Sequence, residues 1–157
     1  MTNKEIKIAY LEYESADQLD PQDRKLAQAA IEATGNSYAP YSHFNVGAAV
    51  MLEDGEIIKG ANQENAAYPS GLCAERTALF YAGATHPDKA VIKLAIAAGQ
   101  NGKLCDTPAT PCGACRQVMA QYQFKGGRPM EVLLIGARNI WKFSKVDDLL
   151  PLIFDSI

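Results

Sequence analysis

The amino-acid sequence predicts an α/β fold, specifically a three-layer α/β/α sandwich with a mixed central sheet. Short and almost uninterrupted apolar runs at residues 91–98 and 130–136 are typical of strands that are covered on both faces. Helical patterns separate these runs, as expected when helices pack on either side of a sheet. Because 157 residues suit one domain, we expect a single domain over residues 21–157, preceded by an N-terminal arm at residues 1–20.

The arm and the first helix have simple local signals. Apolar and polar residues alternate near residues 5–8, which favours a short extended segment. Pro21 precedes helical spacing over residues 22–34, and Gly35 follows it, matching the usual start and stop signals of a helix. Pro40 disfavours helix in the residue before it, so a loop is expected next.

A hairpin and a second helix follow this loop. Residues 46–52 and 57–61 have strand patterns, and the Asp-Gly pair ending at Gly55 supplies the positive φ angle of a tight turn. Residues 73–83 are predicted to be helical. Since residues 77–83 carry no charge, we expect this helix to be buried all round.

The remaining elements complete the order αββαβαβ. The strand at residues 91–98 is followed by a predicted helix at residues 112–122 and by the apolar strand at residues 130–136. The tail, residues 146–154, is predicted to form a short helical turn that stops near Pro151. No internal repeat or linker is apparent.

The composition narrows the class of partner. A hydrophobic content of 48% with 21% charged residues is ordinary for a globular protein, and no apolar run approaches the length of about 20 residues that a membrane span needs. The first residues contain no apolar signal core, so a cytoplasmic location without membrane association is expected. A net charge of -3 argues against a main role in binding nucleic acid and favours a small uncharged substrate.

Three of the four cysteines have the spacing of a metal site. Cys112 and Cys115 are three positions apart at a helix start, and Cys73 begins another helix, whereas Cys105 stands apart. Three thiolates would give a tetrahedral zinc ion three ligands and leave the fourth position to water, as in catalytic sites. The alternative is a redox-active Cys-x-x-Cys pair, which has no use for the third cysteine.

Two charged residues follow the first of these cysteines. Glu75 lies two positions after Cys73, where a hydrolytic site needs a proton carrier. Zinc with three thiolates has a net charge of -1, and Arg76 is placed to donate hydrogen bonds that offset the excess. The alternative is that both charges are solvated residues of a first helical turn.

These motifs resemble the cytidine deaminase family in its small form, which has three cysteine ligands. The resemblance extends over residues 38–49, 62–69, 73–78, 111–117 and 149–151 and leaves out the first twenty residues. It implies one Zn²⁺ per subunit, held by Cys73, Cys112 and Cys115. The implied reaction is hydrolytic deamination of cytidine and 2′-deoxycytidine, with water attacking C4 of cytosine and Glu75 transferring the protons.

The same resemblance implies how a nucleoside is bound. Phe44 would stack on the base, Asn62 and Glu64 would hydrogen-bond the ribose hydroxyl, and the Ala74 N–H would meet the base carbonyl. The resemblance further implies a homotetramer whose sites are completed across subunits. The residues expected to reach a neighbour's pocket are Ala66, Tyr68 and Phe154.

Three other functions remain open from the sequence. A deaminase of a related cytosine nucleoside or a cytosine-containing antibiotic would share the zinc site but differ around the ribose, and Asn62 with Glu64 favours the plain nucleoside. A polynucleotide-editing deaminase would need a basic groove, which the acidic balance does not suggest. A non-catalytic zinc-binding module would normally use four protein ligands.

Overall fold

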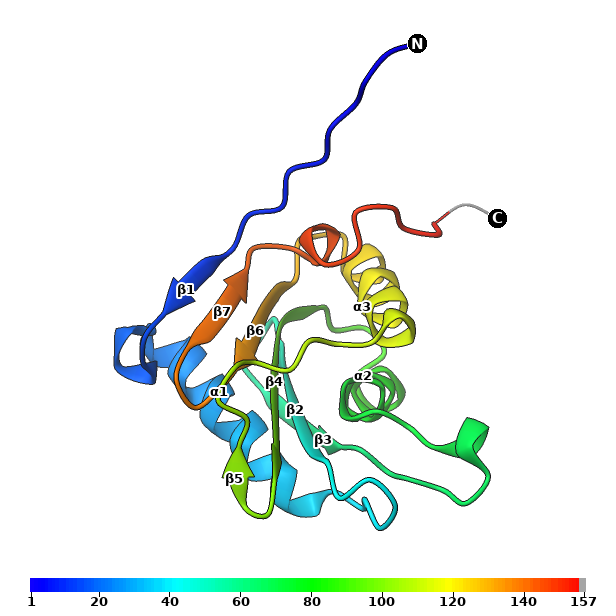
Figure 1. Cartoon of the computed structure of the whole chain (residues 1–157). Coiled ribbons are helices and arrows are strands. Elements are labelled where there is room, and N and C mark those ends of the chain that lie inside the picture. The colour runs from blue at the N-terminus through cyan, green and yellow to red at the C-terminus, as the bar shows by residue number, and fades with distance from the viewer. Residues whose placement is uncertain (156–157) are drawn as a thin grey trace.

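A computed structural model describes residues 1–155, and its centre is a seven-stranded mixed sheet (Figure 1). The strand order is β1-β7-β6-β4-β2-β3, and β5 pairs with β4 outside this path. The strands are β1 Leu11–Tyr13, β2 Asn45–Leu52, β3 Ile57–Ala61, β4 Val91–Gln100, β5 Lys103–Leu104, β6 Glu131–Ile135 and β7 Ile140–Phe143. The helices are α1 Pro21–Ala33, α2 Ala74–Thr85 and α3 Gly113–Gly126.

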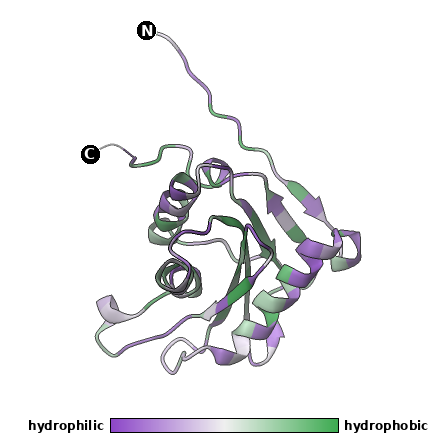
Figure 2. Cartoon of the chain, turned by 180° about the vertical axis from the view of Figure 1, so that it is seen from behind, coloured by the Kyte–Doolittle hydropathy of each residue, from purple (hydrophilic) through white to green (hydrophobic). Residues whose placement is uncertain are grey.

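Alternating side chains of the strands bury two separate cores. Val50 and Leu94 pack in a core with α2 and α3 residues, whereas the neighbouring Met51 and Ala95 pack in the core that contains Leu26 of α1. The sheet therefore has α1 on one face and α2 with α3 on the other, and its central strands are strongly hydrophobic (Figure 2). Since β4 is antiparallel to β2 and parallel to β6, the predicted three-layer sandwich with a mixed sheet is confirmed.

The long elements match the sequence predictions within a few residues, and three short strands were missed. β5 has two residues, β1 three and β7 four, too few for a periodic pattern. β7 pairs with β6 on one side and β1 on the other, so it joins the start of the chain to the sheet. In the tail, the expected helical turn is a single 3₁₀ turn, Val146–Asp148.

The expectation that α2 is buried all round is wrong. Phe80 and Tyr81 are 42% and 58% exposed, while Ala78 and Leu79 are fully buried. The helix therefore packs on the sheet through a face of small and aliphatic residues and presents aromatic side chains on its other side. None of the helices within residues 1–155 is both long enough and apolar enough to cross a membrane.

The first turns of α2 lie very close to β3, because Gly60 of β3 faces the helix and has no side chain. A Cβ atom placed on Gly60 would lie 2.4 Å from the backbone nitrogen of Ala78 and 2.9 Å from the carbonyl oxygen of Ala74. Backbone atoms cannot turn aside as a flexible side chain can. Gly60 thus sets the distance between the sheet and the first turns of α2.

We expect Gly60→Ala to lower the free energy of unfolding by about 3 kcal/mol, the upper range for overpacking a tight core. The change pushes α2 away from β3, and chemical denaturation followed by circular dichroism measures it. Gly35→Ala is the matched control, because a Cβ at Gly35 meets no atom within 4 Å. Equal stability of the two variants would contradict this account of the packing.

Candidate metal centre and active site

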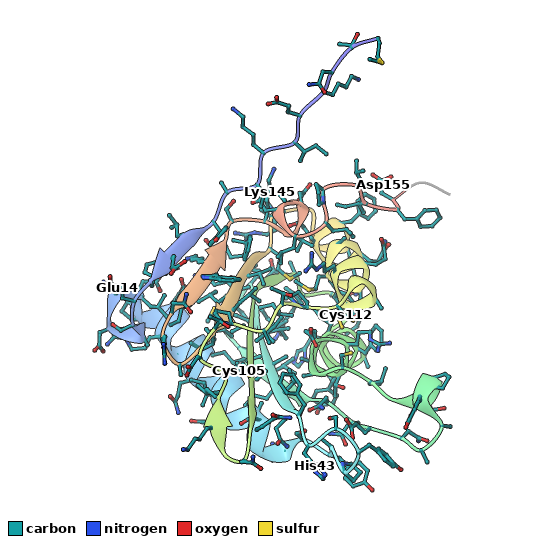
Figure 3. All side chains as sticks on the ribbon, in the orientation of Figure 1. Glu14, His43, Cys105, Cys112, Lys145 and Asp155 are labelled. Carbon is teal, nitrogen blue, oxygen red and sulfur yellow. The ribbon has the colours of Figure 1, made fainter. Side chains whose placement is uncertain are left out.

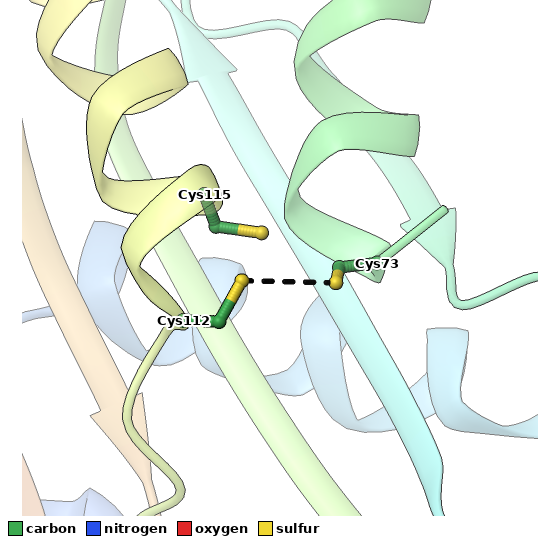
Figure 4. Close-up of side chains that lie close together, drawn as sticks. All are labelled: Cys73, Cys112 and Cys115. Carbon is green, nitrogen blue, oxygen red and sulfur yellow. Dashed lines mark hydrogen bonds between the residues drawn. The ribbon is translucent and has the colours of Figure 1, made fainter. Parts of the chain in front are cut away.

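Two helix N-termini bring the three cysteines together (Figure 4). Cys73 is the N-cap residue of α2 and Cys112 is the N-cap residue of α3, and neither side chain forms a capping hydrogen bond. Cys115 follows in the first turn of α3 and is completely buried. The sulfurs of Cys73 and Cys112 are therefore not used for capping. The fold brings these two residues together although they are 39 positions apart in the sequence.

The distances between the sulfurs suit one tetrahedral zinc ion. All three Sγ atoms lie within 4.8 Å of one another, and those of Cys73 and Cys112 are 4.0 Å apart. Zinc–sulfur bonds of about 2.3 Å at tetrahedral angles separate two sulfurs by about 3.8 Å, whereas a disulfide needs about 2.05 Å. The cluster fits zinc with three thiolate ligands and does not fit a disulfide.

The surroundings of Cys73 favour its thiolate form. A hydrogen bond from the Cys115 thiol, together with the charge and hydrogen bond of the Arg76 guanidinium, lowers the pKa of Cys73 to about 5. The hydrogen bond that Cys115 donates, together with its burial, raises the pKa of Cys115. The positive ends of two helix dipoles favour negative charge at the same place. The protein thus supplies thiolate character at Cys73, the form in which a cysteine binds zinc.

Glu75 is buried beside the cluster, and one of its two carboxylate oxygens lacks a partner in the described part of the chain. Its side chain is 4% exposed, and Oε2 makes no hydrogen bond in the described part of the chain. Burial raises the pKa of the Glu75 carboxyl, and the negative charge of Cys73 raises it further. An orphaned carboxylate oxygen in an apolar surrounding is costly, so this atom is placed for a group that binds in the site.

Arg76 contacts the metal ligands directly. Its Nη2 lies 3.5 Å from Sγ of Cys73, and its buried Nε has no hydrogen-bond partner within residues 1–155. The position agrees with a cation that offsets negative charge on the sulfurs. It does not agree with a freely solvated first-turn side chain.

A cavity of about 510 Å³ opens beside the cysteine cluster. Among the residues expected to bind substrate, Asn62, Glu64 and Tyr68 line it. Cys73 and Arg76 also line it, so the cavity joins the cysteine cluster to the polar segment after β3. Its volume is in the range of small-molecule pockets.

Asn62 and Glu64, the two residues expected to bind ribose, are held by hydrogen bonds that the sequence analysis missed. Oδ1 of Asn62 accepts from Ser37 Oγ at 2.5 Å and from the Val46 N–H at 2.8 Å, and Nδ2 donates to the Phe44 carbonyl at 2.9 Å. These bonds fix the amide orientation and leave one Nδ2 hydrogen uncommitted.

Glu64 is held in a similar way by the loop before β2. Its Oε2 accepts from the N–H groups of Tyr41 and Ser42 at 2.9 and 3.2 Å, and Oε1 accepts a short hydrogen bond from Ser42 Oγ. The Ser42 hydroxyl, followed by the Tyr41 N–H, lowers the pKa of the Glu64 carboxyl. The carboxylate is therefore ionised and already oriented.

Other expected substrate residues lie elsewhere in this chain. Phe44 precedes β2 and Ala74 is the first residue of α2, but neither lines the cavity, and Ala66 does not line it either. Phe154 lies in a different groove, where its backbone exchanges hydrogen bonds with the Gln117 side chain of α3. Cys105 stands apart from the metal cluster (Figure 3).

A three-thiolate centre with an orphaned buried carboxylate, carried on an α/β/α sandwich, defines a zinc-dependent hydrolytic enzyme. Residues 20–126 match the family model described as the cytidine and deoxycytidylate deaminase zinc-binding region. The chain belongs to this family.

Individual relatives agree with the family match. A cytidine deaminase of Sporosarcina psychrophila is 41% identical over 127 residues, which are 81% of this chain and 87% of the relative. One from Halalkalibacterium halodurans is 48% identical over 96 residues, 61% of this chain and 68% of the relative. The crystal structure of cytidine deaminase from Burkholderia pseudomallei superposes with a TM-score of 0.69 at 40% identity, covering 83% of this chain and 97% of that one.

Proposed function

We propose that this protein deaminates cytidine and 2′-deoxycytidine hydrolytically to uridine and 2′-deoxyuridine, with release of ammonia. The observation that carries the proposal is the orphaned Oε2 of Glu75 beside the three cysteines. A cytoplasmic role in pyrimidine salvage belongs to the same proposal, as does one catalytic domain over residues 21–157.

Glu75 is proposed as the single proton carrier of the reaction. Cys73, Cys112 and Cys115 would hold the zinc ion, which when bound would lower the pKa of water and so supply a nucleophile at neutral pH. Oε2 of Glu75 would accept a proton from the attacking water and deliver it to N3 of cytosine. The same carboxyl then protonates the leaving amino group, because Glu75 is a buried acid that lies beside Cys73 and hydrogen-bonds Cys115 of the cluster.

The substrate pocket is proposed to recognise a neutral nucleoside. The free Nδ2 hydrogen of Asn62 and the carboxylate of Glu64 suit a ribose hydroxyl, which both accepts and donates hydrogen bonds. Phe44 is proposed to stack on the base, and the free N–H of Ala74 in the first turn of α2 to bind the base carbonyl. An ionised Glu64 would repel a 5′-phosphate that came near.

The site is proposed to be completed by other copies of the chain in a homotetramer. Exposed aromatic side chains support this, because a monomer rarely leaves so many unpartnered. Tyr68 is 78% exposed at the cavity and Phe154 is 68% exposed in the other groove. The residues proposed to reach a neighbour's site are Ala66, Tyr68 and Phe154.

The proposal is tested by measuring ammonia release from a set of cytosine compounds. Cytidine and 2′-deoxycytidine should both be deaminated, whereas CMP, a cytosine-containing single strand and a cytosine nucleoside antibiotic should react much more slowly. No release from either nucleoside would refute the proposed function. Preferential release from the antibiotic would favour that alternative.

Arg76→Ala is expected to lower turnover of cytidine about 10- to 100-fold, the usual effect of losing a side chain that supports metal ligands. The change removes the hydrogen bond to Sγ of Cys73 and the positive charge beside the sulfurs. Turnover and zinc per subunit should be measured together. Arg138→Ala is the control, because the Arg138 side chain forms an exposed ion pair with Asp106. Unchanged turnover and zinc content in Arg76→Ala would remove Arg76 from the metal site.

A further inference from the structure

We propose that the projecting segment, residues 1–10, pairs with the same segment of a second copy of this chain. The two segments would form an antiparallel ribbon that joins β1 of one sheet to β1 of the other. This interface is separate from the deaminase site and precedes the region matched to the family, which begins at residue 20.

The base of the projecting segment is fixed firmly to the sheet. Glu12 in β1 accepts hydrogen bonds from Asn139 Nδ2 at 3.0 Å and from Trp141 Nε1 at 3.1 Å. The Tyr10 ring lies 5.4 Å from the Trp141 ring and 5.2 Å from the Phe143 ring, between ring centroids. The direction in which the segment leaves the sheet is therefore set by these contacts.

Beyond this base the segment has no partner in its own copy. Residues 1–9 are exposed, make no hydrogen bond to the rest of residues 1–155, and extend away from the body of the molecule (Figures 1 and 3). Holding a residue in one backbone conformation costs about 1–2 kcal/mol. Pairing with another strand would offset this cost with backbone hydrogen bonds.

The pattern of the segment is that of a strand with one apolar face. In an extended chain, Ile6 and Ile8 lie on the same face as Tyr10, and they are 58% and 53% exposed. β1 is an end strand of the sheet, and within residues 1–155 it pairs with β7 alone, so its outer edge keeps N–H and C=O groups that no described strand pairs with. Such an edge is a template for one more strand.

Charge and hydropathy select the register of a twofold pair. With Ile8 opposite the partner's Ile8, Ile6 lies opposite the partner's Tyr10, and Lys4 lies opposite the partner's Glu12. Every apolar residue of that face then meets an apolar residue, and the charges at the ends are opposite. A pair centred on Lys7 would place two lysines together, and a pair centred on Ile6 would place Ile8 opposite a lysine.

Disulfide trapping in the full-length protein tests this register. Directly opposite residues of an antiparallel pair have Cα atoms about 4.5–5.5 Å apart, which a disulfide can bridge. Under mild oxidation, Ile8→Cys should form a covalent dimer of twice the 17.0 kDa chain, at a rate that does not depend on protein concentration. Ile6→Cys is the matched control. In this register the cysteine at position 6 lies opposite Tyr10 of the partner, so the two introduced cysteines are four residues, or about 13 Å, apart along the strands. This variant should therefore cross-link at least about tenfold more slowly.

The outcomes are distinct from those of the deamination assay. Native cysteines are present in both variants and in the unmodified protein, which gives the background cross-linking. Faster trapping of Ile6→Cys would refute the register, and trapping of neither variant above background would refute pairing between copies. Deamination by both reduced variants should equal that of the unmodified protein, so a failure of the proposed function would appear separately.

Discussion

Replacing Glu75 with glutamine should reduce turnover of cytidine by a factor of about 100 to 10,000, the range associated with loss of general acid–base catalysis. Glutamine keeps the size of the side chain and cannot carry a proton. The carboxylate is buried and its Oε2 has no partner within residues 1–155, so a neutral amide should leave the folded state at least as stable. The measurement is turnover at saturating cytidine, with zinc per subunit determined on the same sample.

Measurements of stability and zinc content distinguish a loss of catalysis in Glu75→Gln from a loss of folding or of metal. Glu75→Gln should bind one zinc per subunit and unfold at the same or a higher temperature. Glu32→Gln is the control, since Glu32 forms an exposed ion pair with Lys59 and lies in α1 on the other face of the sheet. Retention of turnover within a few-fold in Glu75→Gln would show that another group transfers the protons.

Cys112→Ser should abolish turnover by removing zinc rather than by unfolding α3. Cys112 is the N-cap residue of α3 and its sulfur forms no capping bond, whereas serine is among the best N-cap residues. The helix should therefore keep its stability while the metal loses a thiolate. Loss of a residue that only supports a ligand lowers metal affinity by up to about a hundredfold. Because Cys112 is itself expected to be a ligand, we expect zinc affinity to fall by more than that.

Zinc per subunit after dialysis, together with the unfolding temperature, measures this effect. Cys105→Ser is the control, because Cys105 lies outside the cluster of three. Chelation of the unmodified protein should reproduce the loss of turnover, and added zinc should restore it. If Cys112→Ser held a full complement of zinc and remained active, Cys112 would not be a ligand.

The sequence predicted the fold where elements are long and buried. Residues 94–98 of β4 and 132–135 of β6 are apolar, because helices cover both faces of the sheet, and this leaves a clear pattern. β7 could not be predicted in the same way, because Trp141 and Lys142 lie at a less protected part of the sheet and the strand exists through its pairing with β6 and β1. The exposed face of α2 was missed because an uncharged helix does not reveal which of its sides faces the sheet.

The metal centre was predictable because its chemistry limits the residue types. Few arrangements other than a zinc site explain a third cysteine near a carboxylate, and the structure brings these residues together. Ser37 and Ser42 were not found, because a hydroxyl in a loop has many possible partners and no periodic pattern. The place of Phe154 outside the cavity was also not predicted, because its hydrogen bonds with Gln117 join segments 37 positions apart in the sequence.

The hydrogen bonds that hold Asn62 and Glu64 have a thermodynamic consequence for ligand binding. Freezing a flexible polar side chain on binding costs about 0.5–1.5 kcal/mol. Here Ser37, the Val46 N–H and the Ser42 loop have already removed that freedom during folding. If these two side chains bind ribose as proposed, calorimetry should find a smaller entropic penalty for cytidine in the unmodified protein than in Ser37→Ala, in which the Asn62 amide loses one of the three hydrogen bonds that orient it before the ligand arrives.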